Sequence, residues 1–202
     1  PNQNMKDGIW CVDELANKIG FKNGDKIISA DGVTVDRYSD ILEKVITSKK
    51  ITVERAGENV SLEMPINLID QFLNNSTKFI LYPRIPTIVS GVLENSNAKT
   101  GGLQKNDIIT SVNGIDCEYF DQFKSQLIDN VGNTIDVTVT RNKKDVQLTI
   151  LVSDKGELGF MPATPSISQL EKLNYYTLAS FKYGFFASFP AGYNKAIKKL
   201  GS

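Results

Sequence analysis

Histidine is absent from all 202 residues of this sequence. The imidazole ring is the commonest general base in enzymes, a common ligand of zinc and a member of the Ser-His-Asp triad. Cysteine is also scarce, because only Cys11 and Cys117 occur, far apart and without a metal-binding spacing such as C-x-x-C. A disulfide between them is possible, but nothing in the sequence requires it. The sequence is therefore not expected to carry a catalytic centre or a metal site of its own.

Neither sign of charge is in excess, since 23 Lys and Arg residues balance 23 Asp and Glu residues. No net field attracts nucleic acid or an anionic membrane surface. There is no signal-peptide pattern and no run of about 20 apolar residues, so the sequence as given is not expected to direct its own export or span a bilayer. Its 41% hydrophobic and 23% charged residues are typical of packed globular domains.

An internal repeat divides the chain into two copies. The segment 20–32, GFKNGDKIISADG, recurs as 102–114, GLQKNDIITSVNG, and later blocks recur in the same order. An offset of 82 residues at this first block is too long for a solenoid unit and fits a duplicated small domain. We therefore expect each copy to fold around its own core.

Turn residues and apolar periodicity predict the same elements in both copies. The elements are strands at 26–30 and 108–112, tight turns at Asp31-Gly32 and Asn113-Gly114, a helix at 119–131, and ladder strands at 51–55, 60–64, 135–141 and 146–152. The predicted fold class is a strand-rich α+β domain, twice.

Two segments of the second copy resemble bacterial PDZ domains. The run at 92–115, VLENSNAKTGGLQKNDIITSVNGI, resembles their central signature, and the run at 156–162, GELGFMP, resembles their GLGF carboxylate-binding loop. This loop follows the ladder strands, and a matching stretch at 78–83 closes the first copy. That order resembles the tandem, circularly permuted PDZ domains of RseP-type proteases, which are zinc-dependent intramembrane enzymes of the site-2 protease family.

The resemblance implies a domain organisation and a role. We expect a first PDZ-like domain at 1–86, a second at 87–165, and a helical tail at 166–202 that leads toward a transmembrane segment. The chain is expected to be the periplasmic loop of a bacterial inner-membrane protease and not an enzyme itself. Its zinc would lie elsewhere in the parent, because the H-E-x-x-H motif is absent here.

The implied partners are the remainder of the protease and a membrane-anchored substrate such as a cleaved anti-sigma factor. The tandem would screen substrates after a first cleavage, either by binding the new C-terminus or as a steric size filter. Two alternatives stay open: a substrate-binding module of an HtrA-like or tail-specific serine protease, and a scaffolding module of a secretion complex.

The resemblance also implies the residues of a peptide site in the second copy. PDZ domains add a peptide as a strand to a sheet edge, while backbone N–H groups of a turn hold its terminal carboxylate. The expected donors are the N–H groups of Leu158, Gly159 and Phe160, and Met161 continues the pairing strand. In the first copy the equivalent residues are Phe79, Ile80 and Leu81.

A β-branched residue replaces glycine in the first-copy turn. Ile80 makes a carboxylate turn harder to form, so we predict weak or absent binding there. Ile80 packing as strand core is the other interpretation.

On the predicted helix, Phe123 and Leu127 are candidates to line a pocket for small or medium aliphatic C-termini. An apolar helical stripe is more often plain core, so both interpretations stay open for these two residues. Phe120 and Val131 are assigned to the core.

Four other residues receive structural interpretations. Asp25 and Asp107 lie among Gly and Asn residues and are expected to serve as turn residues rather than as metal ligands. Cys117 aligns with Val35, which predicts a buried thiol. Trp10 is expected to anchor a core.

Overall fold

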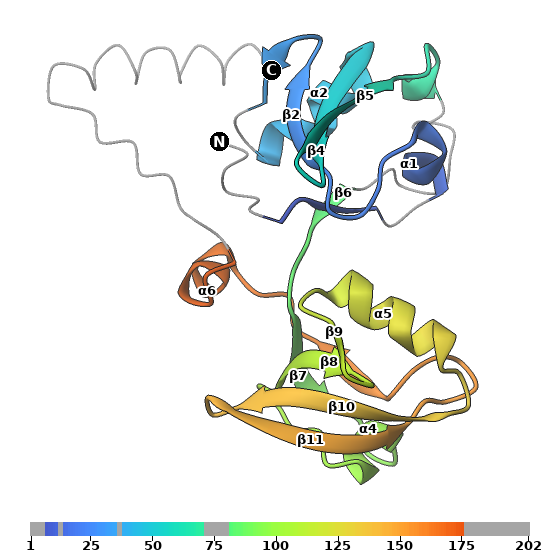
Figure 1. Cartoon of the computed structure of the whole chain (residues 1–202), viewed down its shortest axis with the longest axis vertical. Coiled ribbons are helices and arrows are strands. Elements are labelled where there is room, and N and C mark those ends of the chain that lie inside the picture. Colours follow the sequence, from blue (N-terminus) through green and yellow to red (C-terminus); the bar gives the residue numbers. More distant parts are fainter. Residues whose placement is uncertain (1–6, 12–13, 36–37, 71–80, 176–202) are drawn as a thin grey trace, which may run out of the picture.

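The structure, a computed structural model, describes residues 7–11, 14–35, 38–70 and 81–175 (Figure 1). These residues form two hydrophobic cores. The first core draws on residues between Ile9 and Leu81 and also includes Leu170, and the second draws on residues between Val89 and Leu158. The predicted strand-rich α+β class is confirmed. The boundaries at 86 and 165 stay predictions.

The first half of the chain contains two antiparallel sheets. One pairs β1 (Ile9–Cys11) with β6 (Leu81–Pro83), and the other runs in the order β3 (Val33–Thr34), β2 (Lys26–Ala30), β4 (Lys50–Arg55) and β5 (Glu58–Glu63). The helices are α1 (Glu14–Ile19), the 3-10 turn η2 (Tyr38–Asp40) and α2 (Ile41–Thr47).

The second half contains one six-stranded sheet. Its order is β11 (Lys144–Leu151), β10 (Thr134–Arg141), β8 (Ile108–Val112), β7 (Thr87–Val92) and β12 (Phe160–Pro162), and β9 (Ile115–Asp116) pairs with β8. The helices are α4 (Asn97–Thr100), α5 (Phe120–Asp129) and α6 (Ile167–Lys172). Figure 1 shows α5 on the side of this sheet that faces the first half.

The helix predicted at 119–131 is α5, with shorter bounds. The N–H of Tyr119 donates to Gln122 Oε1 at 3.0 Å, so a backbone N–H at the N-terminal end of the helix has a hydrogen-bond partner. Gly132, with a φ of +75°, lies in the turn that follows. Val131 therefore lies outside the helix and is 42% exposed, so its assignment to the core is wrong. Phe120 is half-buried and packs against the second core.

The tail is described only in part. α6 ends at Lys172, and most of the helical tail expected at 166–202 falls outside the described residues. Leu170 of α6 is 3% exposed and belongs to the first core, so α6 crosses back from β12 to the other half. Within the described residues, no helix is long and apolar enough to cross a membrane.

Each half is held by the same buried ion pair. In the second half, Arg141 Nε donates to Asp107 Oδ1 at 2.8 Å and Arg141 Nη2 donates to Asp107 Oδ2 at 2.7 Å. In the first half, Arg55 makes the equivalent two bonds to Asp25, both at 2.7 Å. Both Asp side chains are fully buried. The hydrogen bond to Asp raises the pKa of both arginines.

The Nη2 atom of each arginine also donates a hydrogen bond to the loop that precedes the aspartate. Nη2 of Arg55 donates to the Gly20 carbonyl at 2.7 Å, and Nη2 of Arg141 donates to the Gly102 carbonyl at 2.8 Å. Asp25 and Asp107 do serve as turn residues, as predicted, because they accept the N–H groups of Lys22 and Gln104. The arginine partners were not foreseen.

Replacing Arg141 with Met should lower the free energy of unfolding by about 3 kcal/mol or more, because it leaves the buried Asp107 carboxylate without its counter-charge. Lys99→Met is the matched control. It breaks the ion pair between Lys99 and Glu94, whose side chains are 55% and 78% exposed respectively. This change should lower the free energy of unfolding by less than about 1 kcal/mol. Urea denaturation followed by circular dichroism measures both. Equal losses in the two variants would contradict a structural role for the buried pair.

Candidate functional site

The edge strand β12 presents backbone groups that its neighbour does not use. Phe160 lies opposite Val92 of β7, and the N–H of Leu93 donates to the Gly159 carbonyl at 3.1 Å. In an antiparallel ladder this places Phe160 and Val92 in a non-hydrogen-bonded pair. The N–H and C=O of Phe160 therefore point away from β7, toward the outer edge of the sheet.

The turn before β12 exposes further donors. The Leu158 carbonyl accepts from the N–H of Ala98 at 2.7 Å, so the carbonyls of Leu158 and Gly159 are both engaged. Within the described residues, no hydrogen bond engages the N–H groups of Leu158 and Gly159. Successive free N–H groups on such a turn form a concavity that suits an anion.

The base of this turn is pinned by a short loop. The N–H of Ser153 donates to the Glu157 carbonyl at 3.0 Å, and the N–H of Glu157 donates to Ser153 Oγ at 3.1 Å. Leu158 is 2% exposed and packs in the second core. The donors are therefore held in place before any ligand arrives.

Gly159 fits this turn for two reasons. Its φ is +88°, and a Cβ on it would lie 2.4 Å from Ser96 Cβ. Ser96 in turn caps α4, because its Oγ accepts from the N–H of Lys99 at 3.2 Å. Ser96 thus sets the space beneath the carboxylate turn. Ser96 lies within the PDZ-like signature at 92–115, but the sequence did not predict this contact.

The two candidate pocket residues lie in the second core. Phe123 is 1% exposed and Leu127 is 6% exposed. The ring centroids of Phe123 and Phe160 are 5.8 Å apart, so α5 contacts the edge strand directly. Met161, the next residue of β12, is 49% exposed. The role of Phe123 and Leu127 as pocket walls stays a prediction.

The start of α5 is fixed by the segment that joins the two halves. Arg84 Nη2 donates to Asp121 Oδ2 at 2.7 Å, and the Arg84 guanidinium lies 4.8 Å from the centroid of the Tyr119 ring. The N–H of Phe120 donates to the Ile85 carbonyl at 2.9 Å. The helix beside the edge strand is therefore tied to the first half, by residues that sequence reasoning missed.

Aromatic rings complete this contact. Trp10 is half-buried and packs on Phe120 in a T-shaped arrangement, with ring centroids 5.5 Å apart, and also on Tyr82 of β6. It is therefore a bridge between the halves rather than an interior core residue. Tyr175, which follows α6, packs on Tyr119, and burial raises the pKa of Tyr175 to about 12.

The remaining predicted residues are placed as follows. Phe79 and Ile80 lie outside the described residues, and Leu81 pairs with Cys11 in the first half. Cys117 is fully buried, as predicted, and burial raises the pKa of its thiol. Since Cys11 belongs to the first core and Cys117 to the second, no disulfide joins them.

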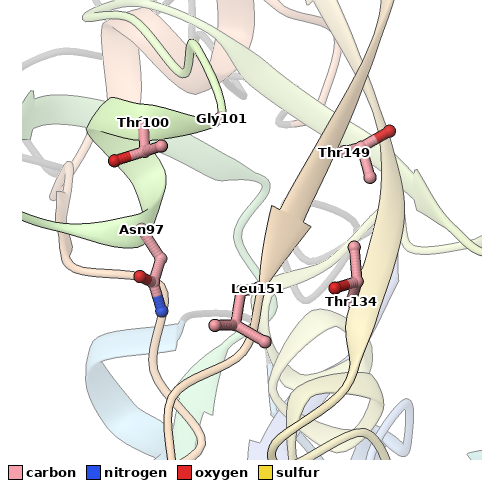
Figure 2. Close-up of a pocket in the computed structure, with 6 residues that line it drawn as sticks. All are labelled: Asn97, Thr100, Gly101, Thr134, Thr149 and Leu151. Atoms are coloured by element: carbon pink, nitrogen blue, oxygen red, sulfur yellow. The ribbon is translucent and has the colours of Figure 1, made fainter.

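A separate hollow lies between α4 and the strands β10 and β11 (Figure 2). It is lined by Asn97, Thr100, Gly101, Thr134, Thr149 and Leu151. These side chains carry no charge, and none of the predicted site residues is among them. The hollow is thus distinct from the β12 edge and offers no group for a carboxylate beyond neutral donors.

Replacing Gly159 with Ala should lower the free energy of unfolding by more than about 2 kcal/mol, because positive-φ strain and the overlap with Ser96 add together. Gly114→Ala is the matched control. Its φ is +75° and nothing lies within 4 Å of its Cβ position, so it should cost about 1–2 kcal/mol from strain alone. Thermal unfolding measures the difference. A smaller loss at Gly159 than at Gly114 would contradict the packed turn.

This chain is similar to several known proteins. Residues 71–152 match the family model described as PDZ domain. A "Putative zinc metalloprotease" of Borreliella burgdorferi is 24% identical over 176 residues, which make up 82% of this chain and 37% of that protein. A "Serine protease Do-like HtrA" of Lactobacillus helveticus is 26% identical over 153 residues, or 71% of this chain and 36% of that protein.

The chain thus spans a little over a third of the length of these curated relatives. Among solved structures, the PDZ domain of an SdrC-like protein from Listeria monocytogenes is 22% identical, covers 38% of this chain and 85% of its own, and superposes with a TM-score of 0.34. On the family match, this chain contains a PDZ domain.

Proposed function

We propose that this chain binds the C-terminus of a protein substrate along the outer edge of β12. The observation that carries the proposal is the set of N–H groups at Leu158, Gly159 and Phe160. Two of them have no partner within the described residues, and the third points away from the sheet. A terminal carboxylate would satisfy all three without a basic side chain.

The peptide would bind as an added strand. Its carboxylate would accept from the turn, and the N–H of its last residue would donate to the outward carbonyl of Phe160. Its last side chain would lie near the aromatic contact between Phe123 and Phe160, which favours an apolar end. Backbone pairing would supply affinity, and this contact would supply selectivity.

We further propose that the two halves are circularly permuted PDZ domains in tandem. Two features support the proposal. The closing strand of each half, β6 or β12, pairs antiparallel with its opening strand, β1 or β7. Each opening strand is also bonded to the equivalent loop, because Ile9 donates to the Asp25 carbonyl and Val89 donates to the Asp107 carbonyl, both at 2.9 Å.

For the whole protein we propose an RseP-like site-2 intramembrane protease. The similarity to a protein named as a zinc metalloprotease along 82% of this chain supports it. The tandem would then be periplasmic, next to the inner membrane at the 166–202 tail. It would gate access for a membrane-anchored substrate such as a cleaved anti-sigma factor. The zinc would be held by the remainder of the protease, which would supply the H-E-x-x-H motif.

Gating could rest on binding or on size alone. In the binding mode, the β12 edge captures the C-terminus that the first cleavage creates. In the filter mode, the tandem excludes bulky extracytoplasmic domains and its edges bind nothing. The ordered N–H donors of the turn favour the binding mode for the second half.

A substrate-binding module of an HtrA-like serine protease is the second candidate. The 26% identity with a protein of that name supports it. Such a parent would supply a Ser-His-Asp triad outside this sequence, which has no histidine. Reading the natural chain on both sides separates the candidates, since an H-E-x-x-H motif with transmembrane spans and a serine-protease domain exclude each other. A tail-specific serine protease would also show a serine-protease domain, whereas a secretion scaffold would show neither feature.

The carboxylate model predicts a difference between two peptides of one sequence. A peptide with a free, apolar C-terminus should bind roughly 10 to 100 times more tightly than its C-terminal amide, because hydrogen bonds to a charged group contribute about 1.5–3 kcal/mol. Isothermal titration calorimetry measures both. Gly159→Ala should abolish the difference, and Gly114→Ala should keep it. Equal binding of acid and amide, or binding of neither, would contradict the model and leave the size filter.

A further inference from the structure

The first half has its own edge strand, β6, and the same ladder rule applies to it. The N–H of Arg84 donates to the Gly8 carbonyl at 3.2 Å, which makes Pro83 and Ile9 a non-hydrogen-bonded pair. By alternation, Tyr82 and Trp10 form the hydrogen-bonded pair. Leu81 and Cys11 then form the next non-hydrogen-bonded pair.

A second contact agrees with this alternation. The N–H of Cys11 donates to Asn23 Oδ1 at 2.8 Å, so it is turned away from β6. The N–H and C=O of Leu81 must likewise point away from β1, toward the outer edge of β6. Leu81 therefore stands in the first half where Phe160 stands in the second, two residues before Pro83 and Pro162 respectively.

The outward carbonyl of Leu81 is already occupied. The hydroxyl of Tyr38 donates to it at 2.6 Å. In the binding mode proposed above, the equivalent carbonyl of Phe160 accepts the N–H of the last peptide residue. Tyr38 thus makes within the chain the bond that a peptide would otherwise make at β6.

The equivalent residue of the second half cannot make this bond. Val35 donates to the Ile28 carbonyl at 3.1 Å, and Cys117 donates to the Thr110 carbonyl at 2.8 Å, which aligns the two segments. Three residues further on, the first half has Tyr38 and the second has Phe120, which lacks a hydroxyl. Phe120 instead packs on Trp10 and on Phe123.

We propose that Tyr38 closes the β6 edge to peptides by occupying the carbonyl of Leu81, the acceptor that a bound peptide would use. The inference rests on the proposed strand addition. It does not depend on the turn at 78–80, because it concerns only the acceptor on β6. A peptide reaching β6 must first displace the Tyr38 hydroxyl, whereas at β12 it meets an outward carbonyl.

The test uses the full ¹⁵N-labelled chain and a ten-residue peptide with a free, apolar C-terminus. Amide shifts of Leu81 and Tyr82 report on β6, and those of Phe160 and Met161 report on β12. In the unmodified chain, peptide should shift the β12 amides alone. Tyr38→Phe removes one oxygen, and it should tighten binding at β6 by about tenfold, which is the upper range for one lost competing hydrogen bond.

Tyr82→Phe is the matched control, because it removes a hydroxyl from the same strand at a side chain that is 43% exposed. It should behave as the unmodified chain does. Tyr38→Leu, which also lacks the hydroxyl and keeps an apolar side chain for the core, is measured alongside in case Tyr38→Phe does not fold.

Two results would overturn the inference. One is an unmodified chain whose β6 and β12 amides shift at the same peptide concentration. The other is a folded Tyr38 variant whose β6 amides do not respond to peptide. Failure of the proposed function is distinguishable, since it appears as silent β12 amides in the unmodified chain, whatever the β6 amides of the variants do.

Discussion

The alternation of the antiparallel ladder is the constraint on which the proposed site depends. A strand can direct the N–H and C=O of a given residue to one neighbour only, and the next residue faces the opposite side. At β12 the bond from Leu93 to Gly159 fixes this phase, so Phe160 faces outward. A shift of one residue would turn these groups toward β7 and remove the site.

The register of β12 against β7 is stabilised by residues that would not contact the peptide. The pair of Arg141 and Asp107 anchors the loop to which β7 bonds, since the Asp107 carbonyl accepts from Val89. Ser96 packs closely against Gly159. The hydrogen bond from Arg84, which lies just after β6, to Asp121 positions α5. The two halves are thus connected at the helix that lies beside the edge strand.

Local signals in the sequence predicted much of the fold. The strands at 26–30 and 108–112 have the predicted bounds, because each apolar run ends in an Asp-Gly or Asn-Gly turn that allows a positive φ. The turn at Leu158 and Gly159 could be predicted from a short motif and its place after the ladder strands. Val131 was misassigned because the apolar period continues past the point where the helix ends.

What could not be predicted depends on contacts between distant segments. Arg141 lay in a recognised repeat, yet its bond to Asp107 joins residues that only the folded sheet brings together. The same holds for Tyr38 and Leu81, and for Trp10 and Phe120, which sit in different halves. A repeat shows that two segments are equivalent. It does not show which side chains meet, nor that one hydroxyl distinguishes Tyr38 from Phe120.

A structure of the chain with a bound peptide that has a free C-terminus would show whether the β12 edge is the peptide site. We expect a strand antiparallel to β12, with carboxylate oxygens about 3 Å from the backbone nitrogens of Leu158, Gly159 and Phe160. A peptide bound in the hollow beside α4, or one whose carboxylate lies in solvent away from these nitrogens, would contradict it.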